Sequence, residues 1–333
     1  MATRRDGRTR PRPLTLLDSA VNPPVRRRLV AETAGMTRDQ YTFSDPAALY
    51  ADIEPQKQRM PEPGLDANLT PRADLGEDTY RGTGRLRGRR ALITGGDSGI
   101  GAATAIAFAR EGADVAISYL PEEEEDAQRI AGLIRDAGVT ALTFPGDLTD
   151  AAYCRELVAK TVDGLGGLDI LVNNGGKQIF NEDLATLSDE QFDATFKTNV
   201  YAMFWITKAA LAHLAPGSAI INTTSIQAYK PSDVLVDYAS TKATINAFTK
   251  ALAQQVAPRG IRVNAVAPGP IWTALQPTDG QPQEKLEHFG EDTPLGRMGQ
   301  PAELAPAYVF LASAESSYVI GETLNVNGGI PSP

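Results

Sequence analysis

A tyrosine and a lysine four residues apart, Tyr238 and Lys242, are the strongest candidates for chemistry in this sequence. Both fall on a predicted helix over residues 238–257, so this spacing places the two side chains on one face. A free phenol has a pKa of about 10, which makes it a slow proton donor or acceptor at neutral pH. A nearby ammonium favours the phenolate and lowers that pKa. The pair therefore predicts an acid–base catalyst.

A serine precedes this pair along the chain. Ser225 follows a predicted strand over residues 219–224, so we expect its hydroxyl at the carboxyl edge of a parallel sheet, where ligands bind. Other kinds of site lack their residues, because the chain has two histidines and one cysteine, Cys154. We therefore expect no Ser-His-Asp triad, no cysteine-based zinc site, no internal disulfide and no other metal site.

A glycine-rich segment, TGGDSGIG over residues 94–101, lies between a predicted strand (91–94) and a predicted helix (100–110). Its glycines allow a tight turn, let the backbone approach a pyrophosphate and permit close packing of the helix on the strand. The first turn of the helix then offers free N–H groups to the phosphates. This context favours a dinucleotide site over an ordinary glycine turn.

Strands and helices alternate from residue 85 onward. Further strands are predicted over residues 114–119, 140–144, 168–173, 219–224, 261–267 and 323–326, and the helices include 189–214 and 302–312. This alternation predicts an α/β fold, a single doubly wound parallel sheet of the Rossmann type with helices on both faces. We assign it to one domain over residues 85–333.

Residues 1–84 differ in composition from the rest of the chain. They contain nine prolines and little periodic apolar pattern, which predicts a partly disordered N-terminal arm with at most short helices, for example near residues 45–53. The first 40 residues carry nine arginines and four acidic residues, whereas the whole chain has a net charge of −9. An acidic body binds nucleic acid poorly, so we expect the basic head to be a solvated arm rather than a tether.

Neither a membrane span nor a secretory signal is visible in the sequence. No apolar run approaches the length that a bilayer requires, and no apolar segment follows the arginine-rich N-terminus. We therefore expect a cytoplasmic protein without nucleic-acid or membrane partners.

The motifs together resemble the classical short-chain dehydrogenase/reductase family. TGxxxGxG at residues 94–101 is followed, in the family's order, by Asp147-Leu148, by NNGG at 173–176 where the family has NNAG, and by PGPI at 268–271. The resemblance covers about residues 84–333. The N-terminal extension and the acidic run at 122–125 make the chain most similar to the glucose/ribitol dehydrogenase-like, or general stress protein, subgroup.

This resemblance implies an NAD(P)-dependent oxidoreductase that transfers a hydride between nicotinamide and a carbonyl or an alcohol, acting on CH–OH groups. Tyr238 would exchange the proton with the substrate oxygen, Ser225 would hold that oxygen, and Lys242 would hold the nicotinamide ribose. Asn199 would perturb its helix and complete a proton relay. The implied cofactor-binding residues are Gly95, Asp97, Ser98, Gly99, Ile100, Gly101, Tyr119, Leu120, Asp147, Leu148, Asn173, Gly175, Gly176, Tyr238, Lys242, Pro268, Gly269, Ile271 and Thr273.

The substrate site is expected under a lid over residues 271–296. Its candidate contacts are Gln178, Ser225, Gln227 and Trp272. The lid also offers Leu275, Phe289 and several glutamines, and Tyr229 faces it from another loop, a mixture that suits a small molecule such as an aldehyde, a sugar or a polyol. Two alternatives stay open. A 3-oxoacyl thioester reductase requires a carrier-protein surface that the sequence does not reveal, and a non-catalytic dinucleotide sensor usually lacks the tyrosine or the lysine that this chain keeps.

Cofactor choice depends on the residues just after the strand over 114–119. Tyr119 and Leu120 stand where the family usually has an acidic residue or an arginine, so neither determinant is present. The acidic run at 122–125 would repel a 2′-phosphate of roughly −1.5 to −2 charges. We therefore expect NAD to be preferred over NADP. The resemblance also implies a homotetramer, built through the aromatic-rich helices over 189–214 and 238–257.

Overall fold

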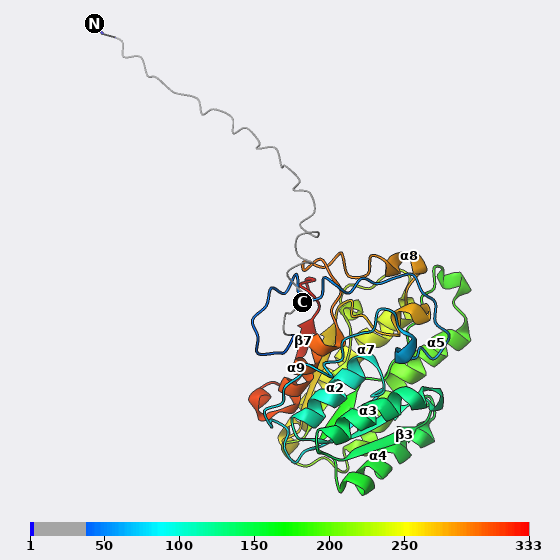
Figure 1. Cartoon of the computed structure of the whole chain (residues 1–333), viewed down its shortest axis with the longest axis vertical. Coiled ribbons are helices and arrows are strands. Elements are labelled where there is room, and N and C mark those ends of the chain that lie inside the picture. Colours follow the sequence, from blue (N-terminus) through cyan, green and yellow to red (C-terminus); the bar gives the residue numbers. More distant parts are fainter. Residues whose placement is uncertain (3–37, 333) are drawn as a thin grey trace.

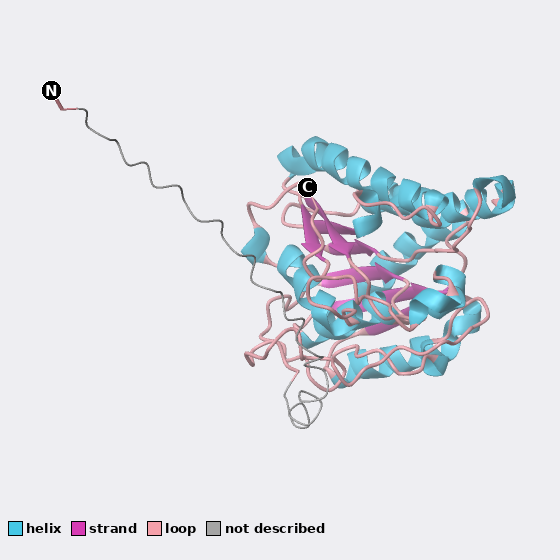
Figure 2. Ribbon diagram, turned by 90° about the horizontal axis from the view of Figure 1, so that it is seen from above, coloured by secondary structure: helices cyan, strands magenta, loops and turns pink. Residues whose placement is uncertain are grey.

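The computed structural model describes residues 1–2 and 38–332, and these contain one sheet of seven parallel strands in the order β3-β2-β1-β4-β5-β6-β7. The strands are β1 (Arg90–Thr94), β2 (Asp114–Tyr119), β3 (Ala141–Pro145), β4 (Ile170–Asn173), β5 (Ala219–Thr223), β6 (Arg262–Pro268) and β7 (Thr323–Val326). Helices cover both faces of the sheet (Figure 2). The predicted α/β fold with a doubly wound parallel sheet is confirmed.

Each face of the sheet has its own apolar layer. One layer involves α2 (Gly99–Arg110), α3 (Glu124–Asp136) and α9 (Pro301–Ala312), and the other involves α4 (Ala151–Leu165), α6 (Ala202–Ala210) and α7 (Val236–Val256). The central strands are buried on both faces, which explains why Ala91, Leu92 and Ile93 form an unbroken apolar run. No helix in the described ranges is both long and apolar enough to cross a membrane.

The strand order creates a crevice at one edge of the sheet. β1 lies between β2 and β4, so the chain builds the sheet outward in opposite directions from the β1–β4 pair. In such sheets, ligands bind outside the carboxyl ends of the strands at this switch point. The loops that follow β1, β4, β5 and β6 meet at that edge, and they contain most of the residues to which the sequence assigns chemistry.

The helix predicted over residues 189–214 is not continuous. The structure has α5 (Asp189–Phe196), then a π-helical turn over Lys197–Tyr201, and then α6, which ends at Ala210. π-turns widen a helix and are frequent at functional sites. Here the widened turn carries Asn199, whose side chain bonds to another loop. The family resemblance implies that Asn199 perturbs its helix, and the π-turn is the form that this perturbation takes here.

The described part of the N-terminal arm, residues 38–84, runs along the sheet domain, beginning with the blue segment in Figure 1. Leu69 and Leu75 are buried in the same apolar cluster as α2 and α9. The short helix expected near residues 45–53 is a series of turns, and a 3₁₀ turn over Asp66–Asn68 is the arm's one helical piece among the described residues. The expected basic head falls largely on residues 3–37, outside the described ranges.

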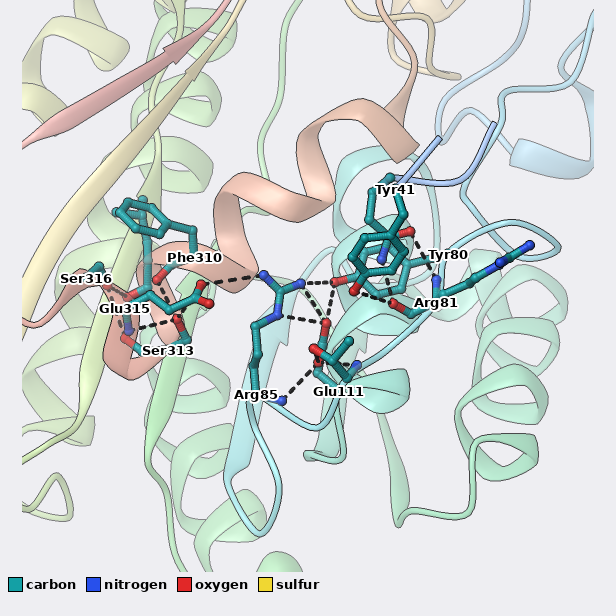
Figure 3. Close-up of polar contacts among 12 residues, drawn as sticks. Tyr41, Tyr80, Arg81, Arg85, Glu111, Phe310, Ser313, Glu315 and Ser316 are labelled. Atoms are coloured by element: carbon teal, nitrogen blue, oxygen red, sulfur yellow. Dashed lines mark hydrogen bonds and ion pairs between the residues drawn. The ribbon is translucent and has the colours of Figure 1, made fainter. Parts of the chain in front are cut away.

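A buried carboxylate joins the arm to the domain (Figure 3). Glu111, just after α2, accepts hydrogen bonds from the Arg85 guanidinium at 2.6 Å and from the Tyr80 hydroxyl at 2.9 Å. Burial alone would raise the pKa of Glu111, but the bonds from Arg85, Thr83 and Tyr80 lower it to about 2. On its other side, the Arg85 guanidinium pairs with Glu315 at 3.5 Å.

Candidate active site

A cleft of about 1200 Å³ opens at the carboxyl edge of the sheet. Its walls come from the loops after β1, β4, β5 and β6 and from the first turns of α7. The glycine-rich segment and the side chains of Ser225, Tyr238 and Lys242 all line this cleft. The position agrees with the ligand crevice that the strand order creates.

Tyr238 and Lys242 project from the start of α7, and both are nearly buried, with 8% and 4% of their surfaces exposed. The Lys242 Nζ lies 5.2 Å from the centroid of the Tyr238 ring and donates a 2.9 Å hydrogen bond to the carbonyl oxygen of Thr223, at the end of β5. Ser225 follows β5, and its Oγ accepts a 3.1 Å hydrogen bond from the backbone N–H of Gln227. β5 and α7 therefore bring a phenol, an ammonium and a hydroxyl to one place.

Burial controls the protonation of this pair. Burial raises the pKa of Tyr238 to about 12, against a smaller lowering by the Ser225 side chain. It also lowers the pKa of Lys242 to about 8. The sequence argument expects Lys242 to lower the pKa of Tyr238, whereas in this structure burial of the phenol raises that pKa. Tyr238 thus keeps its proton at neutral pH and is ready to donate it.

Asn199 connects α7 to the loop after β4. Its Oδ1 accepts a 2.7 Å hydrogen bond from the Lys177 N–H, and its Nδ2 donates to the Lys177 carbonyl oxygen at 2.9 Å and to the Thr241 hydroxyl at 3.0 Å. Thr241 in turn donates to the backbone carbonyl of Tyr238 at 2.6 Å. Asn199 does not line the main cleft. It lies one layer behind Tyr238 and Lys242 and fixes the backbone around them.

The segment between β1 and α2 fits a pyrophosphate. Gly95 and Gly99 have φ of +59° and +49°, which other residues adopt at a cost, and a side chain on Gly95 would lie 3.0 Å from the Cα of Gly175. α2 begins at Gly99, so the free N–H groups of its first turn face this loop. Gly101 is needed for another reason, because a Cβ there would meet the carbonyl oxygen of Gly95 at 1.8 Å.

Most of the residues expected to hold the cofactor line this one cleft. They are Gly95, Asp97, Ser98, Gly99, Ile100, Tyr119, Leu120, Asp147, Leu148, Gly175, Gly176, Tyr238, Lys242, Pro268, Gly269, Ile271 and Thr273. Two do not line it. Gly101 packs inside α2, and the Asn173 side chain points between strands and helices, donating to Asn222 at 2.8 Å and to Thr207 at 3.1 Å. Its neighbour Asn174 lines the cleft instead.

The cleft is acidic near the end of β2. Asp97, Glu122 and Glu123 line it there, and the Tyr119 hydroxyl donates to Glu124 at 2.7 Å. Asp97 is buried, and its Oδ2 has no hydrogen-bond partner in the described ranges. Burial and the neighbouring Glu123 carboxylate raise the pKa of Asp97 well above its usual range.

At the substrate end, Gln178 and Gln227 line the cleft as expected, together with Leu275 and Phe289 of the lid. Trp272 does not. Its ring is fully buried, and its Nε1–H donates a 2.7 Å hydrogen bond to the Pro71 carbonyl oxygen. The structure therefore corrects the expectation that Trp272 contacts substrate, because the indole satisfies its polar atom inside the arm–lid contact.

Glu62 and Lys177 are among the cleft-wall residues that sequence reasoning missed. The Lys177 Nζ lies 2.6 Å from Glu62 Oε1, and both residues line the cleft. Glu62 lies in the proline-rich arm and Lys177 follows the NNGG motif, 115 positions away. No local spacing pattern could have paired them.

Comparison with known proteins agrees with this geometry. A family model described as enoyl-(acyl carrier protein) reductase matches residues 95–331. Among curated relatives, the uncharacterized oxidoreductase YghA of Escherichia coli is 57% identical and covers 86% of this chain and 98% of its own. General stress protein 39 of Bacillus subtilis is 50% identical over 85% of this chain and 98% of its own. NADPH-dependent aldehyde reductase 1 of Arabidopsis thaliana is 42% identical over 83% of this chain and 97% of its own.

Solved structures match a smaller share of the chain. A short-chain dehydrogenase from Burkholderia cenocepacia in complex with NADP has a TM-score of 0.69 and 37% identity, covering 74% of this chain and 98% of its own. A blue fluorescent protein from a metagenomic library in complex with NADPH has the same TM-score and coverage at 33% identity. The alignments with these curated relatives are longer than residues 85–333. They therefore extend into the N-terminal arm. The chain belongs to the short-chain dehydrogenase/reductase family, within its general stress protein subgroup.

Proposed function

We propose that this oxidoreductase interconverts small polar carbonyl compounds and their alcohols, namely aldehydes, sugars or polyols, with NAD(P) as the hydride carrier. The observation that carries the proposal is the protonated, buried Tyr238 phenol, which lines the same cleft as the glycine-rich segment and has Ser225 and Lys242 beside it. A bound nicotinamide would supply the hydride chemistry, while the protein supplies orientation and proton transfer.

In the reducing direction, we assign the proton to Tyr238. Its phenolic O–H donates the proton to the substrate's carbonyl oxygen as the adjacent carbon gains a hydride, so the product is a neutral alcohol. The Ser225 hydroxyl donates a hydrogen bond to the same oxygen and holds it in place. In oxidation, the Tyr238 oxygen takes the alcohol proton. Lys242 would hold the ribose hydroxyls of the cofactor, and Asn199 keeps the start of α7 in position through Thr241.

The lining of the substrate end supports a polar substrate. Gln178, Gln227, Gln281 and Lys177 line it, whereas a long acyl chain would need a continuous apolar wall. The name of the Arabidopsis relative, an NADPH-dependent aldehyde reductase, also supports carbonyl reduction. The second candidate is reduction of an acyl thioester, which the description of the matching family model favours.

Two further properties are part of the proposal. The acidic side chains at the end of β2 favour NAD, while the solved neighbours contain NADP or NADPH and so support a nicotinamide cofactor without supporting that preference. The proposed assembly is a homotetramer. It is supported by Phe192, Tyr201 and Phe204, which are large aromatic side chains exposed on neighbouring helical segments.

The direct test is a steady-state assay of the purified chain with both cofactors and three substrate panels: short aldehydes, aldoses with their polyols, and acyl thioesters. We expect turnover in the first two panels and at least tenfold lower kcat/KM for thioesters. Preference for a thioester would favour the second candidate. Absence of turnover in every panel, with cofactor binding retained, would instead indicate a dinucleotide sensor.

A further inference from the structure

The N-terminal arm is fastened across the substrate lid. The backbone N–H of Met60 donates a 3.1 Å hydrogen bond to the carbonyl oxygen of Pro277 in the lid. Just before Met60 along the arm, Arg59 pairs with Asp279 at 3.2 Å and Lys57 pairs with Glu287 at 3.2 Å. Arm and lid are therefore held together by backbone as well as by charge.

The contact is also close at Gly64. A Cβ at this position would lie 2.1 Å from the Thr278 Oγ1 and 2.9 Å from the Ala274 carbonyl oxygen. Thr278 is buried and already donates its hydroxyl proton to Ala274 at 2.8 Å, so it cannot move away freely. The residues of the arm between Met60 and Gly64 are thus fixed against the lid, and Glu62 lies between them.

Glu62, Pro63 and Gly64 line the cleft together with Ser225 and Tyr238. Glu62 Oε1 is paired with the Lys177 Nζ at 2.6 Å, and Oε2 has no hydrogen-bond partner among the residues that the structure describes. The Glu62 side chain remains 47% exposed. A carboxylate that uses one of its two oxygens and still faces a cleft has acceptor sites left for hydroxyl groups of a ligand.

We propose that Glu62 is a specificity-determining residue of the substrate site, which accepts hydrogen bonds from the hydroxyl groups of a hydroxylated substrate. This inference rests on the proposed function and narrows its substrate class to hydroxyaldehydes, sugars and polyols. Hydrogen bonds to an ionised acceptor are shorter and stronger than neutral ones. An aldehyde without hydroxyl groups leaves the Glu62 carboxylate unmatched and gains nothing from it.

The simpler alternative is that Glu62 only supports Lys177, whose backbone is held by Asn199 behind the catalytic residues. In that case, loss of the Glu62 charge would slow every substrate by a similar factor. The two roles are distinguished by the ratio of kcat/KM for a hydroxylated aldehyde to kcat/KM for a plain aldehyde of equal length. A loss of kcat/KM that is equal for both substrates leaves this ratio unchanged.

The experiment compares glyceraldehyde with propanal in the full-length wild type, in Glu62→Gln and in Glu287→Gln. Glu287→Gln is the matched control, since it removes a different ion pair of the arm, Lys57–Glu287, whose carboxylate is similarly exposed, 48%, but lies outside the cleft lining. We expect the glyceraldehyde-to-propanal ratio to fall at least tenfold in Glu62→Gln, mainly through the KM for glyceraldehyde, and to change less than twofold in Glu287→Gln. A ratio that is unchanged in Glu62→Gln overturns the proposal.

A binding measurement keeps this test separate from the proposed activity. Ribitol and a reduced nicotinamide cofactor cannot react with each other, because both are already reduced, so calorimetry measures the affinity for ribitol without turnover. We expect Glu62→Gln to raise the Kd for ribitol at least fivefold and Glu287→Gln to leave it within twofold. Equal Kd values in the wild type and Glu62→Gln overturn the inference. A fivefold loss in an enzyme that turns over no carbonyl compound would overturn the proposed function alone.

Discussion

The indole N–H of Trp272 donates a 2.7 Å hydrogen bond to the backbone carbonyl of Pro71, 201 positions earlier in the chain. Trp272 lies near the start of the lid, directly after Ile271 of the cleft wall, and its side chain is fully buried. The bond therefore ties the first residues of the lid to the N-terminal arm. Together with the Met60–Pro277 contact, it holds the arm at two points along the lid.

Trp272→Phe should loosen this contact. The variant keeps an aromatic ring but leaves the Pro71 carbonyl without its donor and a small void beside it, a loss of about 2–4 kcal/mol in the free energy of unfolding. Hydrogen exchange of the Met60 amide should accelerate in Trp272→Phe. Trp205→Phe, the matching change at the chain's other tryptophan, should leave that amide unchanged. Equal protection of Met60 in both variants would contradict the role of Trp272.

The same contact shows where sequence reasoning was sufficient and where it was not. Tyr238 and Lys242 lie four residues apart on one helix, so a local period places them together. Gly95 and Gly99 are constrained by the turn in which they occur. The sequence predicts a substrate contact for Trp272 because this residue lies in the expected lid. The arm that buries it contains many prolines and no periodic apolar pattern, so nothing in the local sequence indicated that Pro71 would receive its N–H.

The π-turn at Asn199 illustrates a second limit. Hydrophobic periodicity over residues 189–214 favours one long helix, and only the family resemblance, not that periodicity, points to a perturbation at Asn199. What stabilises the turn is a pair of hydrogen bonds between the Asn199 amide and the backbone of Lys177, 22 positions earlier. Long-range pairs of this kind, including Glu62 and Lys177, require the folded arrangement.

Tyr238→Phe should abolish turnover while leaving the cofactor in place. The variant keeps the ring that fills the cleft wall and removes only the hydroxyl that exchanges the proton, and general acid–base catalysis contributes roughly 10²–10⁴-fold. We expect kcat to fall at least 100-fold and the Kd of the cofactor to stay within threefold. Tyr229→Phe is a suitable control, because Tyr229 does not line the cleft. A kcat above about a tenth of the wild-type value would refute the assignment.

Lys242 should make stability depend on pH in the alkaline range. Its pKa is about 8 in the folded chain against a usual 10.5, so folding releases a proton between these values and stability rises with pH there. A shift of this size corresponds to about 3 kcal/mol. The free energy of unfolding of the wild type, relative to Lys242→Met, should rise by that order from pH 8 to pH 10.5 in urea titrations.

Lys250→Met, an exposed lysine on the same helix, controls for the removal of one lysine from α7. The buried tyrosines titrate in both proteins. Their contribution therefore cancels in the difference in the free energy of unfolding between the wild type and the variant. The stability difference between the wild type and Lys242→Met could instead fall or stay level across this pH range. That result would show that burial does not lower the pKa of Lys242.

Light scattering should give a mass of four times 35.5 kDa, the mass of one chain. Phe192, Tyr201 and Phe204 expose 42–45% of their surfaces, and burying them between copies would remove apolar area from water. Phe204→Glu should lower the mass by placing a charge in that interface. Phe43→Glu, at a fully exposed aromatic of the arm, is the control. A wild-type mass of one chain at micromolar concentration would exclude the tetramer.

Cofactor choice should follow the charge at the end of β2. Glu122 and Glu125 are both exposed residues of the same acidic run, but Glu122 lines the cleft and Glu125 does not. A 2′-phosphate near Glu122 would meet repulsion, whereas an arginine there would pair with it. Fluorescence titration should therefore give a lower Kd for NAD than for NADP in the wild type. Glu122→Arg should tighten NADP at least tenfold with NAD within threefold, and Glu125→Arg should change neither beyond threefold. If the wild type binds NADP tenfold more tightly than NAD, the acidic side chains do not control the choice, and the cofactor follows that of the solved neighbours.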